Sequence, residues 1–94
     1  MTVQQTERIH RKAARFPNQI REYRLKLGIS QRELGKRVGY CRSVISAWER
    51  GNILPSLPNV FRLAKALDTL VESLYLTLYS RVSRAVAKDN RERR

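Results

Sequence analysis

The segment over residues 31–51, QRELGKRVGYCRSVISAWERG, constrains the fold more than any other part of the chain. Its apolar and small residues are spaced as in two short helices that pack at a steep angle. Gly35 lies where close approach leaves room only for a small side chain, and Gly39 lies where the chain must turn in a left-handed conformation that costs glycine little. The apolar contacts between the two helices are assigned to Leu34, Val38, Tyr40, Ile45 and Trp48.

The charge of the chain points to a polyanionic partner. The sequence has 20 Lys and Arg against 8 Asp and Glu in 94 residues, a formal net charge of +12 at pH 7. A positive field of this kind accelerates association with nucleic acid, but it would also favour an anionic membrane surface. The paired short helices decide between the two, because the major groove of double-stranded DNA admits one helix.

Length and composition exclude several other classes of protein. The chain is long enough for one small domain with a modest core. No apolar run approaches the roughly 20 residues of a membrane-spanning helix, and the N-terminus lacks the apolar segment of a secretory signal, so we expect a cytoplasmic protein. Cys41 is the single cysteine, which excludes a disulfide within the chain. His10 has no companion at ligand spacing and no nucleophile is paired with a base, so we expect no metal, no cofactor and no enzymatic activity.

Helix signals dominate the chain and strand signals are almost absent, so we expect an all-α fold. A first helix is expected between Asn18, a suitable N-cap, and Gly28, which ends it. Ser30 and Glu33 form a capping box that opens the second helix. The third helix is expected over residues 42–50, before Gly51.

Two further helices are expected after this pair. Ser56 is a suitable cap for the fourth, in whose first turn Pro58 is tolerated. Thr69 and Glu72 form a second capping box, at which a fifth helix is expected to begin and to extend toward the C-terminus. Its apolar stripe extends further than a five-helix core requires, which predicts a self-association surface. The alternative is that the last turns fray or pack back locally. The residues assigned to that surface are Leu74, Leu78, Val82, Ala85 and Val86.

Residues 20–75 resemble the helix-turn-helix family of phage repressors and Cro-like proteins, also called the XRE family. The resemblance implies a repressor-like bundle of five helices in which the third enters the major groove and the second crosses above the backbone. The chain departs from the family pattern at four positions. Alanine is usual in place of Gly35, and Ser or Thr in place of Cys41. A longer side chain is usual in place of Ala47, and glycine in place of Asp68. The resemblance rests on an ordered set of residues: Arg24, Gly28, Ser30-Gln31, Leu34, Gly39, Ile45-Ser46, Trp48-Glu49, Gly51, Pro55-Ser56, Leu63-Ala64 and Ala66-Leu67.

The resemblance also indicates which residues would contact DNA. Only side chains near the N-terminal end and on the outward face of the third helix can reach base edges. Those assigned to base reading are Arg42, Ser43 and Ser46, with Val44 and Ala47 as apolar neighbours able to contact a thymine methyl group. Those assigned to phosphates are Gln31, Ser43, Arg50 and Asn52. Arg24 and Glu49 are expected to form a partly buried ion pair that holds the third helix.

The expected organisation has three parts: a basic arm over residues 1–17, the DNA-binding domain over 18–75, and a helical extension with a basic tail over 76–94. The arm either contacts DNA or remains in solution, and both possibilities stay open. Its basic residues are Arg8, Arg11, Lys12 and Arg15. Cys41 is interpreted as a structural substitution, with redox sensing as the alternative.

The function expected is that of a transcriptional regulator, acting as a repressor or autoregulator, or as an activator that touches RNA polymerase. One such domain covers half of a binding site, so we expect a homodimer on a pseudo-palindromic operator. One alternative is an antitoxin whose C-terminal segment binds a toxin while the protein regulates its own synthesis. Another is the controller protein of a restriction-modification operon, which would use the same DNA contacts.

Overall fold

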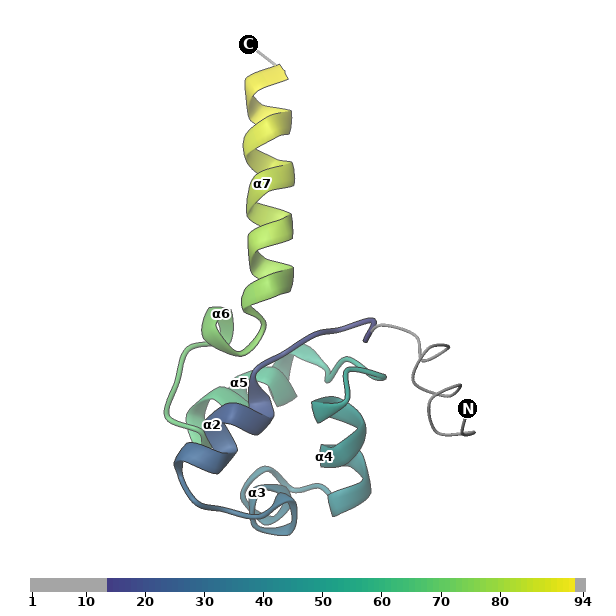
Figure 1. The fold of residues 1–94 in the computed structure, drawn as a ribbon, viewed down its shortest axis with the longest axis vertical. Helices are drawn as coiled ribbons and strands as arrows, with labels where there is room; N and C mark the ends of the chain where they lie inside the picture. The colour runs from purple at the N-terminus through teal and green to yellow at the C-terminus, as the bar shows by residue number, and fades with distance from the viewer. Residues whose placement is uncertain (1–13, 93–94) are drawn as a thin grey trace, which may run out of the picture.

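The computed structural model describes residues 14–92, and these residues form six helices with no strand among them. The all-α fold expected from the sequence is therefore confirmed. In Figure 1 the earlier helices are gathered in a bundle, and the long last helix leads away from it. The helices are α2 (Ile20–Lys26), α3 (Gln31–Val38), α4 (Arg42–Glu49), α5 (Leu57–Ala66), α6 (Val71–Leu74) and α7 (Leu76–Glu92).

The bundle is built around one core, to which every helix from α2 to α6 contributes. α3 occupies a central place, because it packs against both α4 and α5. Each fully buried aliphatic side chain contributes roughly 1.5–3 kcal/mol relative to an exposed one. The largest fully buried side chains are Ile20, Leu34, Ile45, Leu63, Leu67 and Leu74.

The turn between α3 and α4 has the geometry expected from its two glycines. Gly39 has a φ of 87°, and its N–H donates to the carbonyl of Gly35 at 2.8 Å. The N–H of Tyr40 donates to the same carbonyl at 2.9 Å. A Cβ at position 35 would overlap the carbonyl oxygen of Tyr40 and would lie 3.5 Å from the side chain of Ile45. The requirement for a small residue therefore comes mainly from the backbone of the turn.

We expect Gly35→Ala to lower the melting temperature of the domain, even though alanine has a helix propensity about 1 kcal/mol better than glycine. The added methyl group meets backbone atoms of Tyr40 that cannot rotate away. Overpacking of this kind typically costs about 1–3 kcal/mol. Thermal unfolding followed by circular dichroism measures the change, with Lys36→Ala on the exposed side of the same helix as the control. A higher melting temperature for Gly35→Ala would contradict the prediction.

The helix starts agree only partly with the capping residues expected from the sequence. The Oγ of Ser30 accepts a hydrogen bond from the N–H of Glu33 at 3.0 Å, as a capping box requires. The carboxylate of Glu33 instead pairs with Arg37. The N-cap of α2 is Gln19, so the prediction of Asn18 was wrong by one residue. Asn18 nevertheless accepts from the N–H of Ile20 and donates to the carbonyl of Trp48 at 2.8 Å, which links the start of α2 to α4.

The single fifth helix expected after Thr69 is wrong, because the structure has two helices there. The N-cap of α6 is Leu70, and the helix stops at Tyr75, whose φ of −120° and ψ of 45° are not helical. The N–H of Gln19 donates to the carbonyl of Leu74 at 2.7 Å. In a continuous helix that carbonyl would accept from residue 78. A contact from a distant part of the chain therefore replaces the helical bond at this point.

This break also corrects the expected self-association surface. Leu74 is fully buried in the bundle core and cannot contribute to it, while Leu78 packs partly against that core. Every residue from 81 to 90 is exposed, and Val82 is 61% exposed. The open part of the stripe therefore begins near Leu78 and continues along α7. None of the helices over residues 14–92 is long and apolar enough to cross a bilayer.

Candidate nucleic-acid interface

The outward face of α4 is polar and lines a hollow, whereas its inward face packs in the hydrophobic core. Ile45 and Trp48 are buried against the bundle. The opposite side of the helix forms a hollow of about 270 Å³. The described residues that line it are Arg42, Ser43, Ser46 and Arg50. The helical spacing thus brings the three polar base-reading candidates, of which Ser43 is also a phosphate candidate, together with the phosphate candidate Arg50.

The hollow offers hydrogen-bond donors and positive charge. The Nη1 of Arg50 donates to the Oγ of Ser46 at 2.7 Å, while Arg42 is exposed at the first turn of the helix. Among the described residues that line the hollow, none is acidic. Guanidinium groups and hydroxyls are the groups that hydrogen-bond to phosphate oxygens and to the acceptors of guanine.

The two apolar neighbours of this face are placed differently from the polar residues. Val44 and Ala47 are both half buried, and Val44 packs against the hydrophobic core. Neither belongs to the described lining of the hollow. Val44 is therefore committed at least in part to packing, which its position one turn before the buried Trp48 explains.

An ion pair fixes the far end of α4. The Nε of Arg24 donates to Oε2 of Glu49 at 2.6 Å, and its Nη2 donates to Oε1 at 3.1 Å. The Nη1 of Arg24 also donates to the carbonyl of Ile29. The two side chains are only 9% and 4% exposed, so this pair between α2 and α4 is shielded from water. Its two-pronged geometry restrains the orientation of α4 relative to the bundle.

Gln31 extends the same network. Its Nε2 donates to Oε1 of Glu49 at 3.1 Å, so the side-chain amide faces the ion pair in this structure. The sequence predicts a phosphate contact for Gln31 and gives no sign of this bond to Glu49. Asn52 is exposed just after Gly51, and its N–H donates to the carbonyl of Ala47. Three of the assigned phosphate residues, Gln31, Arg50 and Asn52, therefore lie near the C-terminal end of α4.

A second polar network, which was not predicted from the sequence, fixes the turn before α4. The hydroxyl of Tyr40 accepts from Nδ2 of Asn59 at 2.7 Å, and Oδ1 of Asn59 accepts from Arg62 at 2.8 Å. The ring of Tyr40 lies 5.1 Å from that of Trp48. Asn59 is buried although it is polar. In the sequence, the sign that Asn59 makes a buried polar contact was that it directly precedes Val60, which faces the core.

Cys41 occupies the N-cap position of α4, but its side chain makes no capping hydrogen bond. The thiol is exposed. The nearby backbone N–H of Val44 lowers the pKa of Cys41 below the ordinary value of a thiol. Sulfur is a poor acceptor, so the start of α4 is capped less well than a hydroxyl would cap it.

We expect Cys41→Ser to raise the melting temperature, because a serine hydroxyl can accept a hydrogen bond from the first turn of α4. Caps of this kind typically contribute about 0.5–2 kcal/mol. Thermal unfolding of Cys41→Ser and Cys41→Ala measures the effect, since alanine removes the sulfur without supplying an acceptor. Equal melting temperatures for the two variants would contradict the expected cap.

The last residues of the N-terminal arm pack near the end of α4. The N–H of Phe16 donates to the carbonyl of Gly51 at 3.0 Å, and Arg15 lies 5.4 Å from the centre of the Phe16 ring. Gly51 has a φ of 75°, and a Cβ there would come within 2.8 Å of the Phe16 carbonyl oxygen. The arm residues Arg8, Arg11 and Lys12, like His10, lie outside the described residues. Over residues 14–92, no group of His, Cys, Asp and Glu side chains is arranged to hold a metal ion.

Comparison with known proteins places the chain among helix-turn-helix proteins. A family described as helix-turn-helix matches residues 20–74. An uncharacterized HTH-type transcriptional regulator of Methanothermobacter thermautotrophicus is 50% identical over 48 residues, which are 51% of this chain and 70% of that protein. Another from Archaeoglobus fulgidus is 39% identical over 57 residues, covering 61% of this chain and 81% of its own length.

Solved structures agree with this placement. The structure of the restriction-modification controller protein C.AhdI from Aeromonas hydrophila matches this chain with a TM-score of 0.57 and 38% identity. The match covers 61% of this chain and 83% of the C.AhdI chain. The P22 c2 repressor, solved in complex with a synthetic operator, matches this chain with a TM-score of 0.56 and 42% identity. The match covers 57% of this chain and 82% of the repressor chain. The resemblance inferred from the sequence is confirmed, and the chain belongs to the XRE-type helix-turn-helix family, whose members include phage repressors and HTH-type transcriptional regulators.

Proposed function

We propose that the protein is a non-catalytic transcriptional regulator that binds double-stranded DNA by placing α4 in the major groove. The hollow on the outward face of α4 is the observation that carries this proposal, because it presents two guanidinium groups and two hydroxyls from an element held in place at both ends. The similarity to the P22 c2 repressor, solved in complex with a synthetic operator, supports the same function.

Three of the polar residues that line the hollow would read the bases. Arg42 lies at the first turn of α4, where a side chain can reach the O6 and N7 atoms of guanine in a bidentate contact. Ser43 and Ser46 would contribute single hydrogen bonds to base edges or to phosphate. Ala47, and to a smaller extent the partly packed Val44, would supply the apolar contact with a thymine methyl group.

The flanking polar residues would hold the DNA backbone. Arg50 can exchange its bond to Ser46 for a phosphate, which would free the Ser46 hydroxyl for a base. Asn52 is exposed beside it, and Gln31 lies in the first turn of α3, where free backbone N–H groups favour an anion. Phe16 is bonded to Gly51 just after α4, which supports a role for the basic residues that precede it in the chain: they would contact the same duplex.

A second copy of the chain would complete the regulator. The exposed stripe on α7 would pair with its counterpart in a homodimer, so that two α4 helices face successive turns of a pseudo-palindromic operator. The residues assigned to this contact are Leu78, Val82, Ala85 and Val86, together with Tyr79. The structural similarity to C.AhdI supports one specific role, that of a restriction-modification controller protein, in which the DNA contacts would be the same.

We expect Val82→Glu to convert the dimer into a monomer, because a carboxylate at the centre of the stripe would have to be buried without a partner. Sedimentation velocity at micromolar concentration measures the change. Ala87→Glu is the matched control, since Ala87 is also exposed on α7 but lies on a different side of the helix. A monomeric wild-type protein, with and without DNA, would contradict the proposed dimer.

Selection of bound duplexes from a random library tests the proposed function. The expected result is an enriched sequence with two half-sites related by two-fold symmetry and centred about 10–10.5 base pairs apart, or a multiple of that spacing. At physiological salt the selected duplex should bind about a thousandfold or more tighter than a scrambled one. Enrichment of no sequence at all would contradict the proposal.

A further inference from the structure

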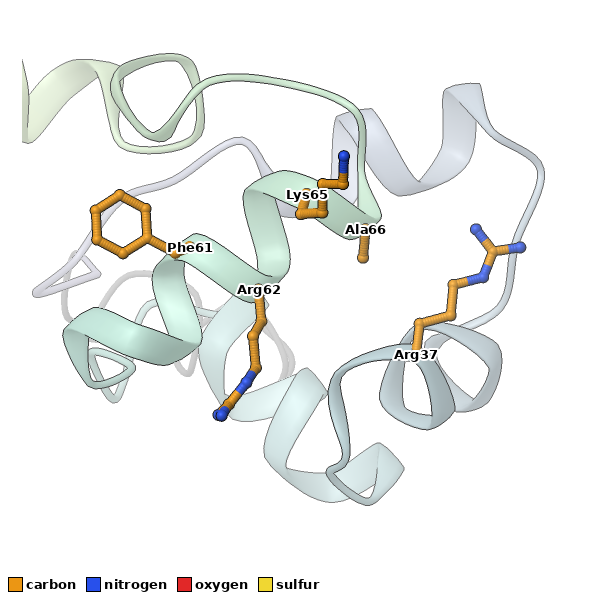
Figure 2. A pocket seen from close by; sticks show the side chains of 5 residues that line it. All are labelled: Arg37, Phe61, Arg62, Lys65 and Ala66. Atoms are coloured by element: carbon orange, nitrogen blue, oxygen red, sulfur yellow. The ribbon is translucent and has the colours of Figure 1, made fainter.

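A second surface on the bundle combines an exposed aromatic side chain with three cations. It forms a hollow of about 370 Å³ whose described lining consists of Arg37, Phe61, Arg62, Lys65 and Ala66. Figure 2 shows Phe61 and Arg37 at the two ends of this surface, with the other three residues between them on α5. Arg37 comes from the last turn of α3.

The aromatic side chain of this surface, Phe61, is not part of the hydrophobic core of the described residues. Phe61 is 58% exposed, and Leu57, one turn earlier on α5, is more exposed still. The same helix already buries its other face through Val60, Leu63 and Ala64. Contiguous exposed apolar side chains bordered by polar groups are typical of sites that bind another protein.

The cations around Phe61 indicate which kind of partner fits. Arg37 is paired with Glu33 at 3.3 Å on the exposed surface of α3, and Arg62 donates one hydrogen bond to Asn59. Both guanidinium groups keep further N–H donors, and Lys65 supplies an ammonium group. A second copy of this chain, with its formal charge of +12, would bring like charge to the surface, whereas carboxylates would complement it.

We propose that this surface binds an acidic peptide segment of a protein partner, in which an aliphatic or aromatic side chain packs on Phe61 and flanking carboxylates pair with Arg37, Arg62 and Lys65. None of these residues belongs to α4 or lines the hollow on α4. The two hollows share no described lining residue, so the proposal includes that the peptide binds while DNA occupies α4. The partner would recruit or restrain the DNA-bound regulator through this contact.

Peptide display tests the proposal with the full-length protein as bait and a random peptide library as the probe. The expected result is enrichment of peptides that carry Asp or Glu on either side of an aliphatic or aromatic residue. A fluorescent copy of the most enriched peptide is then titrated with wild type, Phe61→Ser, Lys65→Gln and Leu70→Ser. Leu70 is the matched control because it is 66% exposed and lies outside the lining of this hollow.

Phe61→Ser should weaken peptide binding about tenfold or more, since the anchor would lose most of its apolar contact. Lys65→Gln should weaken it less, and Leu70→Ser should leave it unchanged within about twofold. Circular dichroism confirms that each variant is folded. Equal binding by wild type and Phe61→Ser, enrichment of peptides without acidic residues, or displacement of the peptide by duplex DNA would each overturn the proposal. The first two of these outcomes are measured without DNA and are independent of whether α4 reads DNA.

Discussion

Glu49→Ala should unfold much of the protein at temperatures where the wild type is stable. The substitution leaves the guanidinium of Arg24, only 9% exposed, without its bidentate acceptor, and it removes the acceptor of the Gln31 amide. Breaking a buried pair by removing one partner costs about 3–5 kcal/mol. In a domain of this size that corresponds to a fall in melting temperature of about 12 °C or more.

Thermal unfolding by circular dichroism provides the measurement, and Glu33→Ala provides the control. Glu33 also pairs with an arginine, but its side chain is 45% exposed, and exposed pairs contribute at most about 1 kcal/mol. The double variant Arg24→Leu with Glu49→Leu should recover part of the lost stability, because no uncompensated charge stays buried. Equal melting temperatures for Glu49→Ala and Glu33→Ala would show that the Arg24–Glu49 pair is not needed to hold α4.

Arg42→Ala should relax the choice of base at one position in each half-site and leave the melting temperature unchanged. A bidentate arginine–guanine contact contributes about 1–3 kcal/mol of discrimination, and a dimer makes the contact twice. Arg42 is exposed, so its removal disturbs no packing in the bundle. The measurement is a repeat of the duplex selection with the variant, followed by titration against duplexes changed at that position.

Two further variants separate base reading from the loss of charge. Arg50→Ala should weaken binding to all sequences about equally and reduce its dependence on salt, because a phosphate contact carries no sequence information. Arg84→Ala removes the same charge from an exposed position on α7 and should preserve the choice of base. An Arg42→Ala variant with unaltered base preference would refute the assignment of Arg42 as a reading residue.

The sequence predicted those parts of the fold that depend on local patterns. The turn at Gly39, the cap at Ser30 and the inward face of α5 follow from helix periodicity and from backbone preferences of single residues. The break at Tyr75 could not be predicted in this way. It depends on a hydrogen bond from Gln19 to Leu74, residues that are far apart in the chain and meet only after the bundle has formed.

The candidate site shows the same division between local and distant contacts. Helical spacing alone brings Arg42, Ser43 and Ser46 to one face of α4, where the structure forms the polar hollow. The bonds from Asn59 to Tyr40 and from Gln31 to Glu49 each join different elements, and no spacing rule along one helix could indicate them. Polar side chains at the edge of the core were therefore the least predictable part of the site.

Intermolecular nuclear Overhauser effects between the labelled protein and its selected duplex test most directly whether α4 reads the major groove. The expected result is a set of contacts from side chains at positions 42, 43, 46 and 47 to base protons of the major groove, absent with a scrambled duplex. The contrary result is a sequence-specific complex in which α4 shows no contact with base protons and the duplex lies against another face of the bundle.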